Sequence, residues 1–438
     1  MSQDISEGLI AAGVARADVT PPVGIRSIGF AARGPLTALH DPLHATALAI
    51  SDGSRKAAMV ACDLLGLDAD TVAEIRAEVH RRTGIAPEHL TVACTHTHYG
   101  PDPYRDRSAP DVVAYRANLI YTVAGAVEEA VSRLRSAYLG VGWGKSDIGV
   151  NRREKLPDGK VILGQNPGGP IDRAVGVLRV DGLDGTPIAC VVNFQTHPVS
   201  QASRTDHISA DYPGKMRDIV ESLTGARCLF LQGACGDINA VKMEPCYEPA
   251  RTLGTRLGCE VVRIWETVVA EPTQGLAVDS ARVSLPGIRY GSEERARELV
   301  RSLEAEIETL TVQNAIDGRI TWAKMRLQKA QNALDSWVTG KPLPPVETEL
   351  QAWRLGDLGI ATAPGEIFNQ IGVAVKERSP TKHTFFVGYA NDSIGYVPVP
   401  EAYPDGGYEV ISACQVDPEA ASILTEDCLR LLEGLAPR

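Results

Sequence analysis

The sequence predicts an α/β fold with a mixed β-sheet core flanked by helices and a helical hairpin inserted into that core. Two observations lead to this prediction. Through residues 56–268, apolar runs of strand length alternate with segments whose apolar residues recur at helical spacing. Such alternation favours one α/β core over separate α and β domains. Residues 291–338 depart from the alternation, because they are charged and strongly helical throughout.

The expected elements follow one another along the chain. A buried strand over 56–67 precedes a helix over 68–84, which begins at an Asp and ends at a Gly. The next strand covers 89–98 and runs into two histidines. The remaining elements of this half are a helix over 111–135, strands over 137–144, 174–182, 188–200 and 226–240, and helices over about 212–223 and 248–268.

The second half begins with the charged segment, which we expect to form a helical hairpin over about 291–338. A Pro-rich stretch then leads back to a strand over 348–366. A tight turn at "DGGYE" follows, and a helix over 418–434 closes the chain. We expect a single catalytic domain over 1–438, without a C-terminal β-sandwich.

Composition excludes several classes of partner. The net charge is −11 and no Lys/Arg cluster stands out, which argues against nucleic acid and anionic membrane surfaces. No apolar stretch approaches the ~20 residues of a membrane span, and the first residues do not resemble a signal peptide. The nine cysteines contain no CxxC pair. These features predict a cytoplasmic protein with reduced thiols that acts on a small-molecule substrate.

Histidines and acids gather where expected strands end. His96 and His98 are two residues apart, so in a strand both side chains face the same cavity. His197 follows the apolar run "IACVVNF", and Glu366 lies where a strand passes into a helix. Together with a phenol such as Tyr396, two imidazoles and a carboxylate suit Zn²⁺ with one position left for water. We therefore predict a zinc site at strand ends. Nearby acids are expected to orient its ligands: Asp63, Asp211 and Asp237.

Several segments, in this order, resemble the catalytic domain of the neutral/alkaline (non-lysosomal) ceramidase family. "ACTHTHYGP" is similar to the family's zinc-binding stretch, "NFQTHPVS" to its second histidine segment and "APGEI" to its glutamate segment. "VNRR", "SADYPGK" and "GYANDSIGYVPVPEAYPDGGYE" also match family segments, and the last keeps the spacing between two functional tyrosines. The resemblance covers nearly the whole chain.

The resemblance implies specific roles. It implies that Zn²⁺ is held by His96, His197, Glu366 and Tyr396. It implies that His98, Arg152 and Tyr408 contact the scissile amide or its oxyanion. In the family, water bound to the zinc hydrolyses the amide of N-acylated sphingoid bases, which agrees with the chemistry of a zinc site that has an open position.

The chain also departs from the family. Asn239 stands where the family has a catalytic serine, although its side chain can still donate a hydrogen bond to substrate. The charged helices of 291–338 are not expected beside a pocket for a lipid chain. We therefore expect zinc-dependent hydrolysis of an amide in a small soluble N-acyl or cyclic compound. The alternatives are a zinc-dependent esterase or lactonase, and a non-catalytic metal- or ligand-binding protein.

Overall fold

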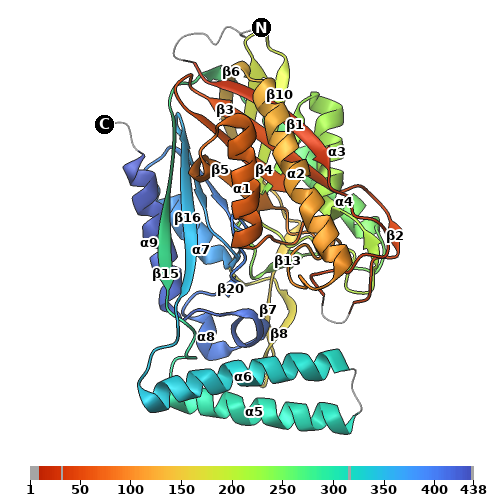
Figure 1. The fold of residues 1–438 in the computed structure, drawn as a ribbon, viewed down its shortest axis with the longest axis vertical. Coiled ribbons are helices and arrows are strands. Elements are labelled where there is room, and N and C mark those ends of the chain that lie inside the picture. The colour runs from red at the N-terminus through yellow and green to blue at the C-terminus, as the bar shows by residue number, and fades with distance from the viewer. Residues whose placement is uncertain (1–8, 31–32, 314–316, 436–438) are drawn as a thin grey trace.

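The computed structural model describes residues 9–30, 33–313 and 317–435 (Figure 1). Its largest sheet has nine strands: β1 (Ala11–Asp18), β3 (His44–Ser51), β4 (Lys56–Cys62), β5 (Leu90–Cys94), β6 (Arg135–Lys145), β9 (Ala174–Gly182), β10 (Pro187–Phe194), β12 (Arg227–Gln232) and β14 (Glu271–Pro272). The order is β12-β10-β9-β6-β1-β3-β4-β5, with β14 beside β6. The pairs β10–β12 and β4–β5 are parallel and the others antiparallel, so the predicted mixed sheet is confirmed.

This sheet is bent at its middle. Its halves are joined by only two residue pairs between β1 and β6, and β12 contacts β5 although the two lie at opposite ends of the strand order. Helices α1 (Ala69–Thr83) and α2 (Pro110–Ser132) pack on the outer face of the β5 half. Helices α3 (Asp211–Thr224) and α4 (Glu248–Thr267) pack on the outer face of the β12 half. The bend therefore brings together the chain segments that follow β5, β10 and β12.

A second sheet completes the core. It contains β15 (Leu276–Leu285), β16 (Val346–Leu355), β17 (Leu358–Thr362) and β19 (His383–Val387), in that order. One face, with Trp353 and Phe385, packs against the inner faces of the large sheet. Helices α7 (Asn369–Arg378) and α9 (Glu419–Gly434) pack beside it in a separate core cluster.

The single strand expected over 348–366 is wrong. The chain turns back between Leu355 and Leu358, which pair across a two-residue loop. Gly356 has a φ of +56°, a left-handed conformation that favours glycine and suits such a hairpin turn. The sequence "LGDL" contains the glycine that favours such a turn, but the apolar residues on both sides favour one continuous strand.

The charged segment forms two packed helices, α5 (Glu293–Val312) and α6 (Asp317–Thr339), between β15 and β16. They lie at the end of the molecule opposite the labelled ends of β6 and β10, beside α8 (Ala402–Asp405) (Figure 1). Lys329 Nζ donates to the backbone oxygens of Ser412 (3.2 Å) and Cys414 (2.8 Å). The hairpin thus supports the π-helical turn Glu409–Ala413 that follows Tyr408.

Short strands complete the fold. They are β2 (Ala38–Leu39) with β11 (His207–Ile208), β7 (Gly149–Lys155) between β8 (Val161–Asn166) and β13 (Ile238–Ala240), and β18 (Glu366–Ile367) with β20 (Tyr396–Val397). All nine cysteines are free thiols, and seven of them are buried. Within the described residues, every helix is too short or too polar to cross a membrane.

Candidate metal centre

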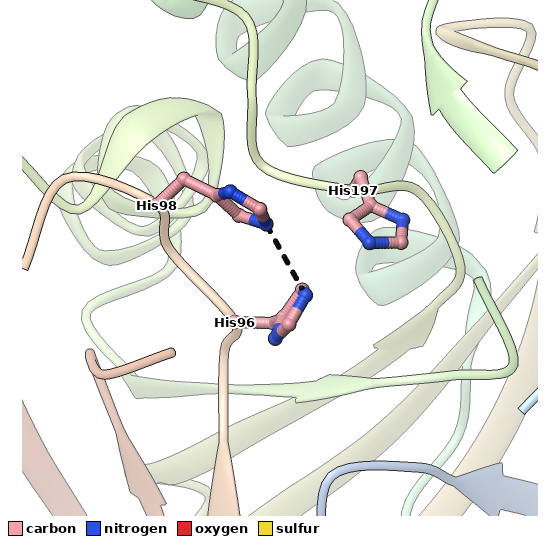
Figure 2. A group of neighbouring side chains, drawn as sticks. All are labelled: His96, His98 and His197. Atoms are coloured by element: carbon pink, nitrogen blue, oxygen red, sulfur yellow. Dashed lines mark hydrogen bonds between the residues drawn. The ribbon is translucent and has the colours of Figure 1, made fainter. Parts of the chain in front are cut away.

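The histidine pair lies beyond β5 rather than within it. The strand ends at Cys94, and His96 adopts a left-handed backbone conformation with a φ of +67°. The expected strand alternation is therefore not what orients the two rings. A turn orients them instead, held by the His96 N–H, which donates to Leu64 O at 2.9 Å. The two side chains still point toward the same space, as expected, because the Nε2 atoms of His96 and His98 lie 3.2 Å apart (Figure 2).

His197 faces this pair from the segment after β10 (Figure 2). Its ring centroid lies 4.8 Å from that of His96 and 5.6 Å from that of His98. Gln232 at the end of β12 joins the two segments, because its Nε2 donates to Thr95 O (3.2 Å) and Thr196 O (2.9 Å). The three imidazoles are 2 %, 9 % and 0 % exposed in chain order, so the cluster is almost closed to solvent.

The protonation of the three rings follows from their partners. Each Nδ1 contacts a backbone carbonyl: Leu65 O for His96 (2.6 Å), Gly29 O for His98 (3.1 Å) and Cys235 O for His197 (2.6 Å). Because a carbonyl only accepts, each Nδ1 carries a proton, and in a neutral ring Nε2 then presents a lone pair. Burial lowers the pKa of His98 well below its usual range. Burial and the Arg152 guanidinium lower the pKa of His197 to about 4. Both rings are therefore neutral at pH 7.

Glu366 adds a fourth acceptor. Its Oε2 lies 3.1 Å from His197 Nε2 and 3.4 Å from His96 Nε2. Four lone-pair atoms thus converge, and their mutual repulsion calls for a cation between them. Ligands at the corners of a tetrahedron with Zn–N and Zn–O bonds of about 2.0–2.1 Å stand about 3.3 Å apart. The spacings from Glu366 Oε2 to His96 Nε2 (3.4 Å) and to His197 Nε2 (3.1 Å) are close to that value, so the nitrogen and oxygen donors present here fit zinc.

The acids expected to orient the ligands do not contact the imidazoles. Asp63 pairs with the buried Arg217 and accepts from Thr95 Oγ1 at 3.2 Å, while Asp211 accepts from Ser200 Oγ at 2.7 Å. Asp237 accepts from Asn151 and from the Asn369 N–H. That expectation is wrong for all three, because backbone carbonyls take the place of carboxylates on each Nδ1. The acids instead brace the chain segments that carry the site.

Arg152 on β7 links the remaining expected residues. Its Nη2 donates to Tyr396 Oη at 2.9 Å, and its Nη1 lies 3.2 Å from Asn239 Oδ1 and 3.3 Å from His197 Nε2. Its Nε donates to Glu409 Oε1 at 2.8 Å. Glu409 was missed by the sequence analysis. It is fully buried and also accepts from Arg153 Nη1 at 2.7 Å, so one carboxylate anchors two adjacent guanidiniums. The only signal for it was its position directly after Tyr408.

Tyr408 marks the open side of the cluster. It is 38 % exposed, and its ring centroid lies 5.8 Å from that of Tyr396. Burial raises the pKa of the Tyr408 hydroxyl, which therefore remains a hydrogen-bond donor well above neutral pH. Asn239 accepts from Arg152 through Oδ1, which leaves its amide nitrogen to donate. The structure thus brings all eight expected residues into one connected site.

Two solved structures match the whole architecture. A neutral ceramidase from Pseudomonas aeruginosa superposes with a TM-score of 0.73 and 21% sequence identity, covering 98% of this chain and 75% of the other. A ceramidase complexed with C2 gives a TM-score of 0.75 and 20% identity, with the same coverage. No family model and no curated protein matches the sequence. At this identity the likeness establishes a neutral ceramidase-like fold, and the fold expected from the sequence motifs is confirmed.

Proposed function

We propose that the protein is a zinc-dependent hydrolase of an amide bond in a small N-acyl or cyclic amide. One observation supports this most directly. Three imidazole Nε2 atoms and a carboxylate oxygen converge with lone pairs inward, at spacings of 3.1–3.4 Å where they are in contact. The ceramidase-like fold agrees with amide hydrolysis. A metal site alone does not define a reaction, so the surrounding donors carry the rest of the proposal.

In this proposal His96, His197 and Glu366 hold the ion, and Tyr396 supplies the fourth ligand. Bound zinc polarises a carbonyl and lowers the pKa of a coordinated water to about 7. His98 is the most exposed of the three histidines, and in this proposal it faces the substrate. Its Nε2 accepts a proton from the attacking water and gives it to the leaving nitrogen, while Nδ1 keeps its own proton and donates it to Gly29 O.

Arg152 and Tyr408 are the donors for the negative charge that develops on the amide oxygen. Arg152 has a fixed orientation because Glu409 holds its Nε and Tyr396 accepts from its Nη2. Tyr408 is partly exposed, and its hydroxyl keeps its proton because burial raises its pKa. Asn239 donates to the substrate from its amide nitrogen.

The alternatives use the same residues. An ester or lactone fits the same oxyanion donors, so an esterase or lactonase remains the second candidate. A non-catalytic metal-binding protein is less well supported, because holding zinc needs four ligands and gives no role to Arg152 or Tyr408. We further propose that long-chain ceramide is a poor substrate, since Asn239 replaces the family's serine and charged helices replace the surroundings expected of a lipid pocket.

The test combines metal analysis with turnover. Purified protein should contain about one zinc per chain and hydrolyse members of a panel of soluble N-acyl and cyclic amides, and a chelator should abolish this activity until zinc is restored. Efficient cleavage of esters or lactones without amides would favour the second candidate, and turnover of neither would favour the non-catalytic one. Active wild-type enzyme without metal would end the proposal.

Tyr408→Phe serves as a matched variant in the same assay. It removes one oxyanion donor and leaves the proposed ligands in place, so zinc content should be unchanged while kcat falls about 10²–10³-fold. A kcat within a few-fold of wild type would assign Tyr408 to packing.

A further inference from the structure

A short segment after β19, residues 388–391, joins the chain segments that hold the cluster. The Gly388 N–H donates to Gln232 O at 2.9 Å. The Cys94 N–H donates to Tyr389 O at 3.1 Å, next to the turn that holds His96. The Tyr389 N–H donates to Gly365 O at 3.2 Å, one residue before Glu366. The backbone of Tyr389 thus spans two segments that carry acceptors of the site.

The Tyr389 side chain reaches the histidines as well. Its ring centroid lies 4.0 Å from that of His96 at an interplanar angle of 31°, a close, tilted face-to-face contact. Its ring centroid lies 6.4 Å from that of His197, and the two rings are nearly perpendicular. Its hydroxyl is hydrogen-bonded to Cys235 Sγ at 3.1 Å, and Cys235 O is the oxygen that accepts from His197 Nδ1. Tyr389 is 4 % exposed, so no substrate displaces these contacts.

The backbone conformations support a dedicated role. His96 and Tyr389 have φ values of +67° and +56°, which place both in the left-handed region. Residues with Cβ atoms rarely adopt that region, and they do so where the surrounding structure enforces it. His96 and Tyr389, whose rings contact each other, are two of the six described non-glycine residues with positive φ. The local fold therefore constrains the backbone of both residues in this ring contact.

We infer that Tyr389 is a positioning residue that sets the metal affinity of the site. Its ring, which lies against the His96 imidazole, makes the main contribution. Its hydroxyl makes a smaller one by binding Cys235, whose carbonyl orients His197 and also accepts from the Ile238 N–H. An imidazole that binds a cation becomes electron-poor, and the electron-rich face of a phenol ring stabilises it. Groups that orient ligands typically change metal affinity 10–100-fold when removed. The inference rests on the proposed function, because it needs a metal at this cluster.

Two substitutions separate the ring from the hydroxyl. Tyr389→Phe keeps the ring on His96, so zinc affinity should stay within about threefold of wild type. Tyr389→Asn removes the ring but suits a left-handed backbone, and zinc affinity should fall 10–100-fold. Affinity is measured by competition with a chromophoric chelator. The visible spectrum of the Co²⁺-substituted protein reports ligand geometry, and it should change for Asn but not for Phe.

Phe385→Leu is the matched control, because this buried ring in the neighbouring strand contacts Trp143 and not the cluster. It should lose stability but keep zinc affinity. Should Tyr389→Asn not fold, Tyr389→Met tests the loss of the ring at similar apolar volume. An Asn or Met variant with zinc affinity and Co²⁺ spectrum like wild type would overturn the inference, as would equal zinc loss in Phe385→Leu. A wild-type chain that binds no zinc would overturn the proposed function itself.

Discussion

Glu409 offers the sharpest test of how the site is held together. Its carboxylate is fully buried and accepts from Arg152 Nε at 2.8 Å and from Arg153 Nη1 at 2.7 Å. Glu409→Gln keeps the shape and one acceptor oxygen but removes the negative charge. Two guanidiniums that are almost fully buried then lack a counter-charge. Breaking a buried ion pair by removing one partner costs about 3–5 kcal/mol, and the retained acceptor places Gln at the lower end, about 3 kcal/mol.

Urea unfolding at pH 7 with a chelator present measures this loss without any contribution from metal. Glu426→Gln is the control, since it removes a carboxylate that binds Arg378 through both oxygens at the surface. Exposed pairs of this kind contribute little, so the control should leave the free energy of unfolding nearly unchanged. If the two variants unfold at the same urea concentration, the buried charge pair is not what holds Arg152 in place.

The pH dependence gives a second readout of the same variant. Burial opposes ionisation of Glu409, but Arg152 and Arg153 outweigh it and lower the pKa of the carboxyl. A lowered carboxyl pKa stabilises the fold above the unfolded value of about 4.3, and this stability is lost as the pH falls through the folded pKa. The difference between wild type and Glu409→Gln should therefore be constant near neutrality and shrink below about pH 4.

Two further predictions concern other residues. His98→Ala should retain most of the zinc that His197→Ala loses, while its rate falls about 10²–10⁴-fold; equal zinc loss in both variants, seen by elemental analysis, would make His98 a ligand. Burial raises the pKa of Asp211 to about 6, so the folded state favours its protonated form, and stability falls as the pH rises from about 4 to above 6. Asp211→Asn, at a left-handed φ of +55° that Asn tolerates, should remove this pH dependence, while it gives up one of the oxygens that accept from Ser200 and Tyr212. If the free energy of unfolding changes with pH in the same way in wild type and in Asp211→Asn, Asp211 is not the group that titrates. Burial also raises the pKa of Asp237 to about 6, but Asp237 is present in both proteins and affects both alike.

The sequence predicted the helices well because their signals are local. Asp68 caps α1 by accepting from Thr71 N, and Gly84 ends it in a left-handed conformation, as the Asp and Gly at its ends indicated. Strands were harder where a turn interrupts an apolar run, as at Gly356. The bend of the large sheet was not predictable, because it depends on contacts between β5 and β12, which are far apart in sequence.

The candidate site shows the same limit. The metal-binding residue types were found at expected strand ends, and the family resemblance added Arg152, Tyr408 and Asn239. Strand alternation was nevertheless the wrong reason for His96 and His98, because β5 ends at Cys94. The groups that orient the site were missed: Gln232, Tyr389 and Glu409. Each acts through a partner on a distant segment, so no local pattern marks them. The backbone carbonyls that accept from the histidine Nδ1 atoms cannot be predicted from residue types either, because every residue has a carbonyl.

The bent sheet also has a consequence for how the chain acquires an ion. His96 follows one half of the sheet, His197 follows the other, and Glu366 lies on the short strand β18, so more than half of the chain separates the first acceptor from the last. In the strand ladder, only two residue pairs, between β1 and β6, join the two halves. A bound ion would be a cross-link that closes two long chain segments at once, one from His96 to His197 and one from His197 to Glu366. For a zinc-loaded protein, uptake would have to wait until all three parts have docked, and the melting temperature would rise with free zinc by mass action.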